Sequence, residues 1–164
     1  ADLTGVNLDF ANLTDANLAG ANLAGATGWR PSLYRANLAG ADLTGANLAG
    51  ANLTKTNLTQ ADLTEANLTA ADLWRANLTQ ADLSGANLTG ANLLWANLTG
   101  ADLTGADLSS ANLPKADLSG ANLTGADLSW AAFHWVEGTG AKADDETVWP
   151  EGFDPVAAGV IFED

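Results

Sequence analysis

Residues 1–135 repeat with a period of five, and this period limits the possible folds more than any other feature of the sequence. Divided into 27 pentads, the stretch has Leu at the third position in 25, the exceptions being Gly28 and Phe133. The first position is Ala in 24 pentads, and the second is Asn or Asp in 24. A short fixed period is typical of repeat architectures, in which neighbouring units bury a shared core.

A period of five fits neither the 3.6-residue period of an amphipathic helix nor the two-residue period of a long strand. Within one pentad, however, the first and third residues face the same side if the backbone is extended. An extended segment followed by a turn in every pentad places all the Ala and Leu side chains inside a coil. Gly, which is common at the fifth position, suits such a turn because it adopts backbone angles that strain other residues.

Aspartates at the second position indicate how many pentads form one coil. They fall at intervals of twenty in Asp42, Asp62, Asp82 and Asp102. Together with Asp2, this series holds five of the nine aspartates at that position. Such clustering predicts a coil of four pentads with four distinct faces.

Pentads such as Ala-Asn-Leu-Thr-Gly and Ala-Asp-Leu-Ser-Gly, repeated in one register, closely resemble the pentapeptide-repeat family. The resemblance implies an all-β fold, a right-handed quadrilateral parallel β-helix with its first and third positions pointing inward. For residues 1–135 it implies about 6.75 coils of four pentads. The stretch from Thr147 to Pro155 also resembles a tail found on bacterial, especially cyanobacterial, members of the family.

The pattern is irregular at residues 26–35, where Gly28 replaces Leu and Pro31 replaces Ala without a change of phase. One interpretation is a distorted coil. The other is a small recognition loop built from Trp29, Arg30, Tyr34 and Arg35.

Residues 136–164 differ in composition from the repeat and predict an acidic C-terminal cap. Asp154, Pro155 and Gly159 have the order of an N-cap, a first helical residue and a C-terminal Gly, which predicts a short helical turn. The apolar residues expected to cover the last coil are Trp149, Phe153, Val160, Ile161 and Phe162.

Composition excludes several classes of protein. A formal net charge of -14 disfavours binding to nucleic acid, whose phosphates are also negative. The chain has no Cys and one His, and no apolar run approaches the roughly 20 residues of a membrane span, so we expect no metal site and no membrane association. A core filled by Leu leaves no substrate pocket, so we expect no catalysis and no cofactor.

One face of the coil gathers most of the basic and aromatic residues. The pentads that start at residues 11, 31, 51 and so on carry, at their fourth and fifth positions, four of the six Lys and Arg residues and four of the seven Trp and Tyr residues. The candidate contact residues are Tyr34, Arg35, Lys55, Trp74, Arg75, Trp95, Lys115 and Trp135. Aromatic and Arg side chains are enriched in protein interfaces, which favours a face that binds another protein. Alternatively, these side chains only cover the rod and stack on one another.

The opposite face carries Asp2, Asp42, Asp62, Asp82 and Asp102. The face with the basic and aromatic residues would complement an acidic surface, including the Asp-bearing face of a second rod. Self-association is therefore a further expectation. The first functional hypothesis is a non-catalytic structural or protein-interaction module of bacterial origin. The alternative, implied by the family resemblance, is an acidic rod that imitates DNA and inhibits or protects DNA gyrase. The nearly invariant central Leu and the mostly Thr and Gly exterior favour the first hypothesis.

The sequence begins inside a pentad without an initiator Met, so we expect that a leader or a tag has been removed. A cytoplasmic location is the first expectation, and a lost leader would instead indicate a periplasm or a thylakoid lumen. Neither the partner nor the oligomeric state follows from any motif.

Overall fold

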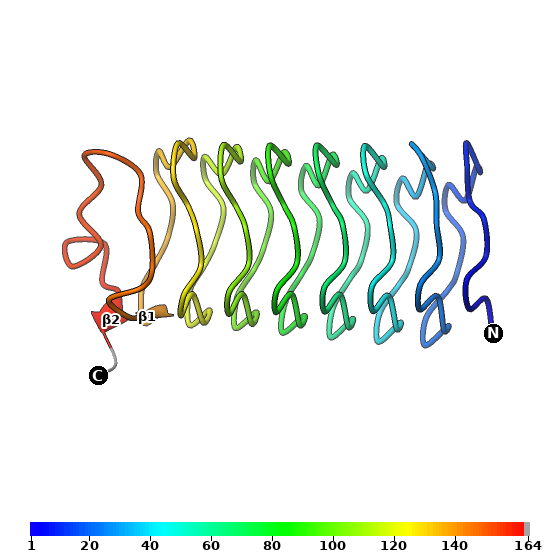
Figure 1. The fold of residues 1–164 in the computed structure, drawn as a ribbon, viewed down its shortest axis with the longest axis horizontal. Coiled ribbons are helices and arrows are strands. Elements are labelled where there is room, and N and C mark those ends of the chain that lie inside the picture. The colour runs from blue at the N-terminus through cyan, green and yellow to red at the C-terminus, as the bar shows by residue number, and fades with distance from the viewer. Residues whose placement is uncertain (163–164) are drawn as a thin grey trace.

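The computed structural model describes residues 1–162 and shows a rod with the two termini at opposite ends (Figure 1). Its regular strands are β1, Lys142–Ala143, and β2, Ile161–Phe162, which pair in parallel near the C-terminal end. Elsewhere the chain pairs through single parallel bridges between residues twenty apart, such as Asp82 and Asp102. Within the described residues there is no helix. The predicted right-handed, four-sided β-helix is confirmed.

The hydrogen bonds of a single pentad explain why its sequence is so restricted. In residues 81–85 the second, third and fifth amides donate to carbonyls of the two neighbouring coils, at 3.0, 2.7 and 2.9 Å. The first amide donates to the carbonyl of Leu78 at 3.0 Å and closes a turn. The fourth amide, that of Ser84, donates to Oδ1 of Asp82 at 2.9 Å. Every amide therefore has a partner, and Asn or Asp is needed at the second position because its side chain supplies the fourth acceptor.

The interior is a column of Leu with Ala beside it. From Leu23 to Leu128 the central Leu side chains are at most 1% exposed, and the first-position Ala residues are buried with them. Burial of each Leu contributes about 2 kcal/mol to stability. The small Ala side chain allows adjacent sides of the square coil to meet.

The irregular residues 26–35 form a distorted coil that keeps the register of the repeat. Thr27 pairs in parallel with Asn7 and with Asn47 on either side of it. A Cβ atom at Gly28 would lie 3.0 Å from Cβ of Leu8 and 3.3 Å from Cγ of Pro31. The neighbouring ring of Pro31 therefore takes part of the space that a central Leu fills elsewhere.

A long-range hydrogen bond replaces the missing local acceptor in this distorted coil. Thr27 has no carboxylate or amide side chain to accept from the fourth amide of its own pentad. That amide, of Trp29, donates instead to Oδ1 of Asp9 in the preceding coil, at 2.7 Å. The substitution of one acceptor for another keeps the pentad in phase.

The coil continues beyond residue 135, where the sequence predicted a separate cap. Glu137 pairs with Asp117, Lys142 with Asn122 and Val148 with Asp127. The last of these pairs spans 21 residues and the β1–β2 pair spans 19, so the C-terminal coil has lost the strict spacing of the repeat. Backbone pairing therefore continues after the Leu pattern ends and forms an irregular additional coil within the segment predicted as a cap. Residues 163 and 164 of the predicted cap lie outside the described part of the chain.

Aromatic side chains replace the Leu column in this last coil. The rings of Phe133 and Phe153 have centroids 4.5 Å apart, and those of Trp149 and Phe153 lie 5.2 Å apart. The indole N–H of Trp149 is buried without a hydrogen-bond partner, which has an energetic cost. The predicted helical turn is present as hydrogen-bonded turns with Asp154 as the N-cap: the amide of Ala158 donates to the carbonyl of Asp154 at 3.2 Å, and the amide of Ala157 donates to Oδ1 of Asp154 at 3.0 Å.

Candidate binding edge

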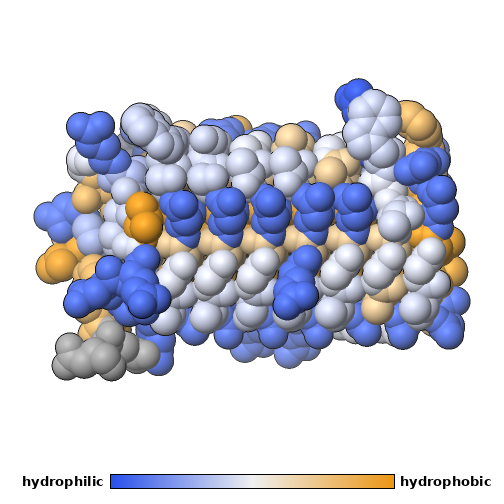
Figure 2. All heavy atoms as spheres, in the orientation of Figure 1, coloured by the Kyte–Doolittle hydropathy of each residue, from blue (hydrophilic) through white to orange (hydrophobic). Residues whose placement is uncertain are grey.

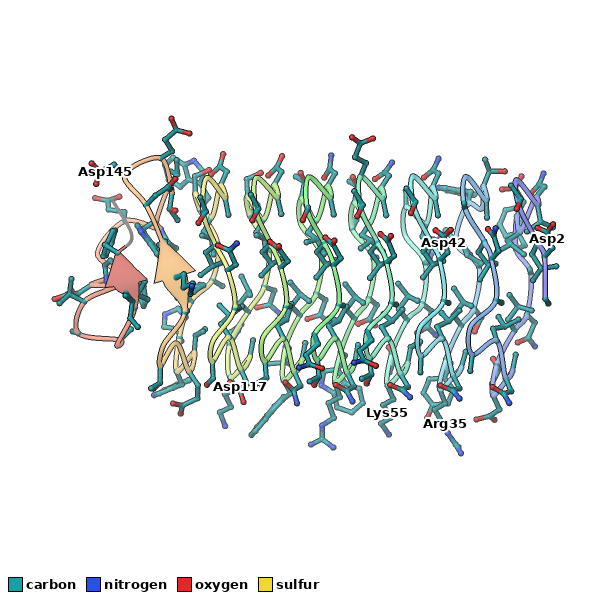
Figure 3. The ribbon with its side chains drawn as sticks, turned by 90° about the horizontal axis from the view of Figure 1, so that it is seen from below. Asp2, Arg35, Asp42, Lys55, Asp117 and Asp145 are labelled. Atoms are coloured by element: carbon teal, nitrogen blue, oxygen red, sulfur yellow. The ribbon has the colours of Figure 1, made fainter. Side chains whose placement is uncertain are left out.

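The eight aromatic and basic residues predicted as contacts lie along one edge of the rod, which we call the aromatic–cationic edge. Each occupies the fourth or fifth position of its pentad, where the chain turns a corner. Bridges from Asn12 through Ser32 to Asn52, and onward to Asn112, stack these pentads directly on one another. Figure 3 shows Arg35 and Lys55 projecting from the border of the rod, away from the side of Asp42. The edge comprises Tyr34, Arg35, Lys55, Trp74, Arg75, Trp95, Lys115 and Trp135.

Cations and indole rings alternate along this edge. Nζ of Lys55 lies 5.2 Å from the ring centroid of Trp74, and Cζ of Arg75 lies 4.8 Å from the same centroid. Cζ of Arg75 also lies 5.8 Å from the ring of Trp95. Each such contact stabilises an exposed site by about 0.5–1 kcal/mol. The side chains therefore stack on one another, as the second interpretation of the sequence expected, and they also form one ordered surface.

The ladder continues to a hollow at the C-terminal end of the edge. Nζ of Lys115 lies 4.3 Å from the ring centroid of Trp95 and 5.9 Å from that of Trp135. Together with Glu137 these residues line a hollow of about 510 Å³. Trp95 is 47% exposed and Trp135 is 77% exposed, so both rings remain accessible to a partner. Glu137 was not among the predicted residues because it lies just beyond the repeat in the sequence.

The N-terminal end of the edge holds an ion pair. Nε of Arg35 lies 3.0 Å from Oδ1 of Asp15, and its Cζ lies 5.9 Å from the ring of Tyr34. Asp15 occupies the same corner one coil earlier, a position that the 20-residue spacing identifies in the sequence. Both charged groups are more than half exposed, so the ion pair adds less than about 1 kcal/mol to stability.

Backbone geometry shows that large side chains are kept on this edge despite strain. Its seven corner residues have φ between 54° and 62°, in the left-handed region that favours Gly, and none of them is Gly. The corner that follows the aspartate series has Gly in six of seven coils, with Glu65 as the exception. A left-handed conformation costs a non-Gly residue about 1–2 kcal/mol. These seven corners are Asp15, at the N-terminal end of the row, followed by the edge residues Arg35, Lys55, Arg75, Trp95, Lys115 and Trp135.

The aspartate series forms a second regular surface, which we call the Asp face. Asp42, Asp62, Asp82 and Asp102 pair directly in successive coils, and Asp2 lies at the N-terminal end of the same face. Oδ1 of each accepts the amide two residues later, for example that of Thr104 at 3.0 Å from Asp102. Hydrogen bonds from the hydroxyl and the amide of Thr64 lower the pKa of Asp62. These carboxylates thus take part in the turns of their own pentads.

The described residues contain no group of three or more His, Asp or Glu side chains arranged to hold a metal ion.

Side chains at other pentad positions also align in rows along the rod, as those of the Asp face do. Figure 2 shows one face where a row of hydrophilic residues runs along the rod between paler rows. Two exposed aromatic groups of the repeat lie on another face, away from the predicted edge. One is Trp130, which is 81% exposed, and the other is the pair of Phe10 and Trp29, with ring centroids 5.4 Å apart. Their positions at the corners of another face could have identified them from the 20-residue spacing.

A parallel coil of four short sides around a Leu column defines a solenoid protein of the quadrilateral β-helix class. The family model for pentapeptide repeats (8 copies) matches residues 1–27, 32–69, 66–105 and 101–136. The chain belongs to the pentapeptide-repeat family. Residues 28–31, which the matches omit, lie in the distorted coil.

Solved structures agree with this assignment. The chain is 34% identical to the pentapeptide repeat protein Rfr23 of the cyanobacterium Cyanothece 51142, over 66% of this chain and 90% of that chain, with a TM-score of 0.56. It is 35% identical to a pentapeptide repeat protein of the Arabidopsis thaliana thylakoid lumen, over 60% and 68% of the two chains, with a TM-score of 0.58.

The plasmid-mediated fluoroquinolone resistance protein QnrB1 is 18% identical over 98% of this chain and 84% of that chain, with a TM-score of 0.50. At that identity the likeness extends to the fold alone.

No curated protein sequence matches the chain. Within residues 1–162 no helix is long and apolar enough to cross a membrane.

Proposed function

We propose that this protein is a non-catalytic interaction module that binds a protein partner through the aromatic–cationic edge. The observation that carries the proposal is the run of seven corners without Gly, all at positive φ, on this edge. Strain retained at successive positions is a common property of functional surfaces. The corners that follow the Asp face have the same backbone geometry, yet six of those seven are Gly. Large residues are therefore not required by the corner itself.

The chemistry of the edge favours an acidic partner with some apolar surface. Lys55, Arg75 and Lys115 are exposed cations on a chain whose formal net charge is -14. The exposed rings of Trp95 and Trp135 supply apolar area between them. A rigid rod holds these groups in place before binding, which reduces the entropy lost on association.

The proposal is tested by affinity capture from the source cells, with captured proteins identified by mass spectrometry. Trp95→Ser combined with Trp135→Ser should reduce capture of a specific partner at least about tenfold, because exposed aromatic residues dominate many interfaces. Trp130→Ser is the control, since Trp130 is at least as exposed as either replaced residue but lies off the edge. Equal capture by the double variant and the wild type, with unchanged circular dichroism, would contradict the proposal.

A second candidate function is to bind DNA gyrase by imitating DNA. The observation that favours it is the regular spacing of carboxylates on the Asp face. A gyrase supercoiling assay at two salt concentrations tests it. Inhibition by the wild type that weakens with salt and is lost in Asp42→Asn, Asp82→Asn, Asp102→Asn would support this candidate. Absence of inhibition by the folded wild type would reject it.

A further inference from the structure

We propose that one partner of the aromatic–cationic edge is a second copy of this chain, which docks its Asp face lengthwise along the edge. This inference rests on the proposed function, since it uses the same edge, and it specifies the partner. The argument depends on charge, spacing and shape.

Three cations of the edge form no ion pair with any residue of 1–162 in their own rod. The ion pair found within residues 1–162 joins Arg35 to Asp15, whereas Lys55, Arg75 and Lys115 lie against indole rings. On the Asp face, the hydrogen bonds of Asp42, Asp82 and Asp102 all use Oδ1. The second oxygen of each carboxylate is therefore available to a cation from another molecule.

The two surfaces have the same spacing because the same coil generates both. Adjacent coils are about 4.8 Å apart, so equivalent positions on both surfaces recur at that distance along the rod. Lys55 and Arg75 lie in adjacent coils, and Lys115 lies two coils beyond Arg75. When two rods align in parallel, Lys55 faces Asp42, Arg75 faces Asp62 and Lys115 faces Asp102, with no mismatch accumulating along the length. An extended acidic peptide presents side chains on one side about every 6.6 Å and would lose this register within two coils.

The shapes of the two surfaces also permit this contact. The fifth position beside the Asp face is Gly in every coil except that of Glu65, and Gly5, Gly25, Gly45 and Gly105 have open space where a side chain would be. The long side chains on the edge of one rod can therefore lie across the Gly corner beside the Asp face of another rod without a steric clash. The carboxylate of Glu65 adds one further acceptor for a cation.

The contact joins two different surfaces, so each rod retains a free edge and a free face after pairing. Such heterologous contacts propagate side by side rather than closing into a dimer. Ion pairs between exposed groups are individually weak and are screened by salt. We therefore expect weak, concentration-dependent assembly that becomes weaker when salt screens the charges.

Sedimentation velocity with the purified full chain tests the inference. Wild-type protein at 0.1 M salt should form species larger than a monomer as its concentration rises. The apparent association constant should fall about tenfold at 0.5 M salt, where screening is stronger. A chain that stays monomeric throughout the accessible concentration range at 0.1 M salt would overturn the inference.

Two variants make the test specific for the two surfaces. The edge variant is Lys55→Gln, Arg75→Gln, Lys115→Gln, and the face variant is Asp42→Asn, Asp62→Asn, Asp102→Asn, which replaces the three carboxylates that face these cations. Asn occupies the second position of many pentads and accepts the same turn amide, so the face variant should fold. Each variant alone should be monomeric, and their equimolar mixture should form dimers and no larger species.

Arg30→Gln, which removes a cation off the edge, should assemble like the wild type. Assembly of either surface variant to the wild-type extent, or failure of the mixture to dimerise, would overturn the inference. Capture of a different partner that still depends on Trp95 and Trp135 would then leave the proposed function standing. Loss of edge-dependent capture together with intact self-association would instead limit the edge to self-recognition.

Discussion

The backbone conformation of each pentad depends mainly on its second and fifth residues. The fifth residue lies in the left-handed region throughout the repeat, with φ of 53° at Ala70 and 64° at Gly90. The second residue supplies the oxygen that accepts the fourth amide, as Asp82 does for Ser84. Side-chain identity at these two positions therefore sets the stability of each corner.

Exchanging Ala and Gly at equivalent corners should change stability in opposite directions. Ala70 and Gly90 lie in adjacent coils of the same face, and no atom lies within 4 Å of where a Cβ of residue 90 would be. Ala70→Gly should raise the free energy of unfolding by about 0.5–1 kcal/mol, because relief of strain exceeds the added entropy of the unfolded chain. Gly90→Ala should lower it by a similar amount. Urea denaturation of both variants measures this, and a destabilised Ala70→Gly protein would show that the corners are not strained.

The turn aspartates should make the rod sensitive to acid. Hydrogen bonds from Thr64 hold the pKa of Asp62 below its ordinary value of 3.8. As the pH falls below about 4, the unfolded chain takes up protons before the folded chain does, so stability present above that pH is lost as the pH passes through the folded pKa. The pKa of Asp117 is also lowered: burial acts to raise it, but hydrogen bonds from Ser119 and Thr99 outweigh that effect.

Replacing these carboxylates by amides should flatten the acid response. Asp62→Asn with Asp117→Asn keeps the turn acceptors but does not titrate. We expect little change in stability at pH 7 and a smaller loss than in the wild type between pH 4 and pH 2.5, measured by thermal unfolding at each pH. Equal losses in both proteins would assign the acid sensitivity to other groups.

At the scale of the coil, four Leu side chains and the amides that pair with the next coil form the unit of stability. Two buried hydroxyl groups have hydrogen-bond partners in the neighbouring coil. Thr56 is fully buried at a first position, and its hydroxyl donates to the carbonyl of Leu33 at 2.7 Å. Thr147 makes the equivalent bond to the carbonyl of Leu123 at 2.9 Å. The same local solution therefore appears in the repeat and in the irregular C-terminal coil.

The cost of losing one central Leu should depend on its coil. Leu83 is completely buried, whereas Leu3 in the first coil is only half-buried. Leu83→Ala should lower the free energy of unfolding by about 2–5 kcal/mol because it leaves a cavity that the rigid coils cannot fill. Leu3→Ala should cost clearly less, about 1 kcal/mol. Chemical denaturation of the pair measures this difference, and equal costs would argue against the described burial.

At the scale of the whole molecule, contacts run between neighbouring coils and the two ends lie far apart (Figure 1). Stability in such a solenoid is approximately a sum over coils and their interfaces, so the ends have fewer stabilising neighbours than the middle. The first coil illustrates this, since Leu3, Leu13 and Leu18 are only half-buried.

Hydrogen exchange should therefore be graded along the rod. Amides of residues 41–120 should be the most protected, and protection should fall towards both ends because the end coils open more easily. Native-state exchange followed by NMR or mass spectrometry measures the gradient. Uniform protection from residue 3 to residue 162 would indicate that the rod opens as one cooperative unit.

The repeat by itself determined the architecture, since a pentad with inward Ala and Leu and a turn at its end has few ways to pair its amides. It also placed the eight residues of the aromatic–cationic edge together, because the 20-residue coil follows from the aspartate spacing. That the edge binds a partner stays a prediction.

Tertiary structure decided the features that depend on contacts between coils. Backbone pairing does not require Leu, so the coil continues through Glu137 and Lys142 where the sequence pattern had ended. Asp9 supplies an acceptor that Thr27 lacks, which kept residues 26–35 in register. Likewise, the hollow that Glu137 shares with Trp95 and Lys115 and the alternation of cations with rings arise from stacking between coils, which local sequence does not specify.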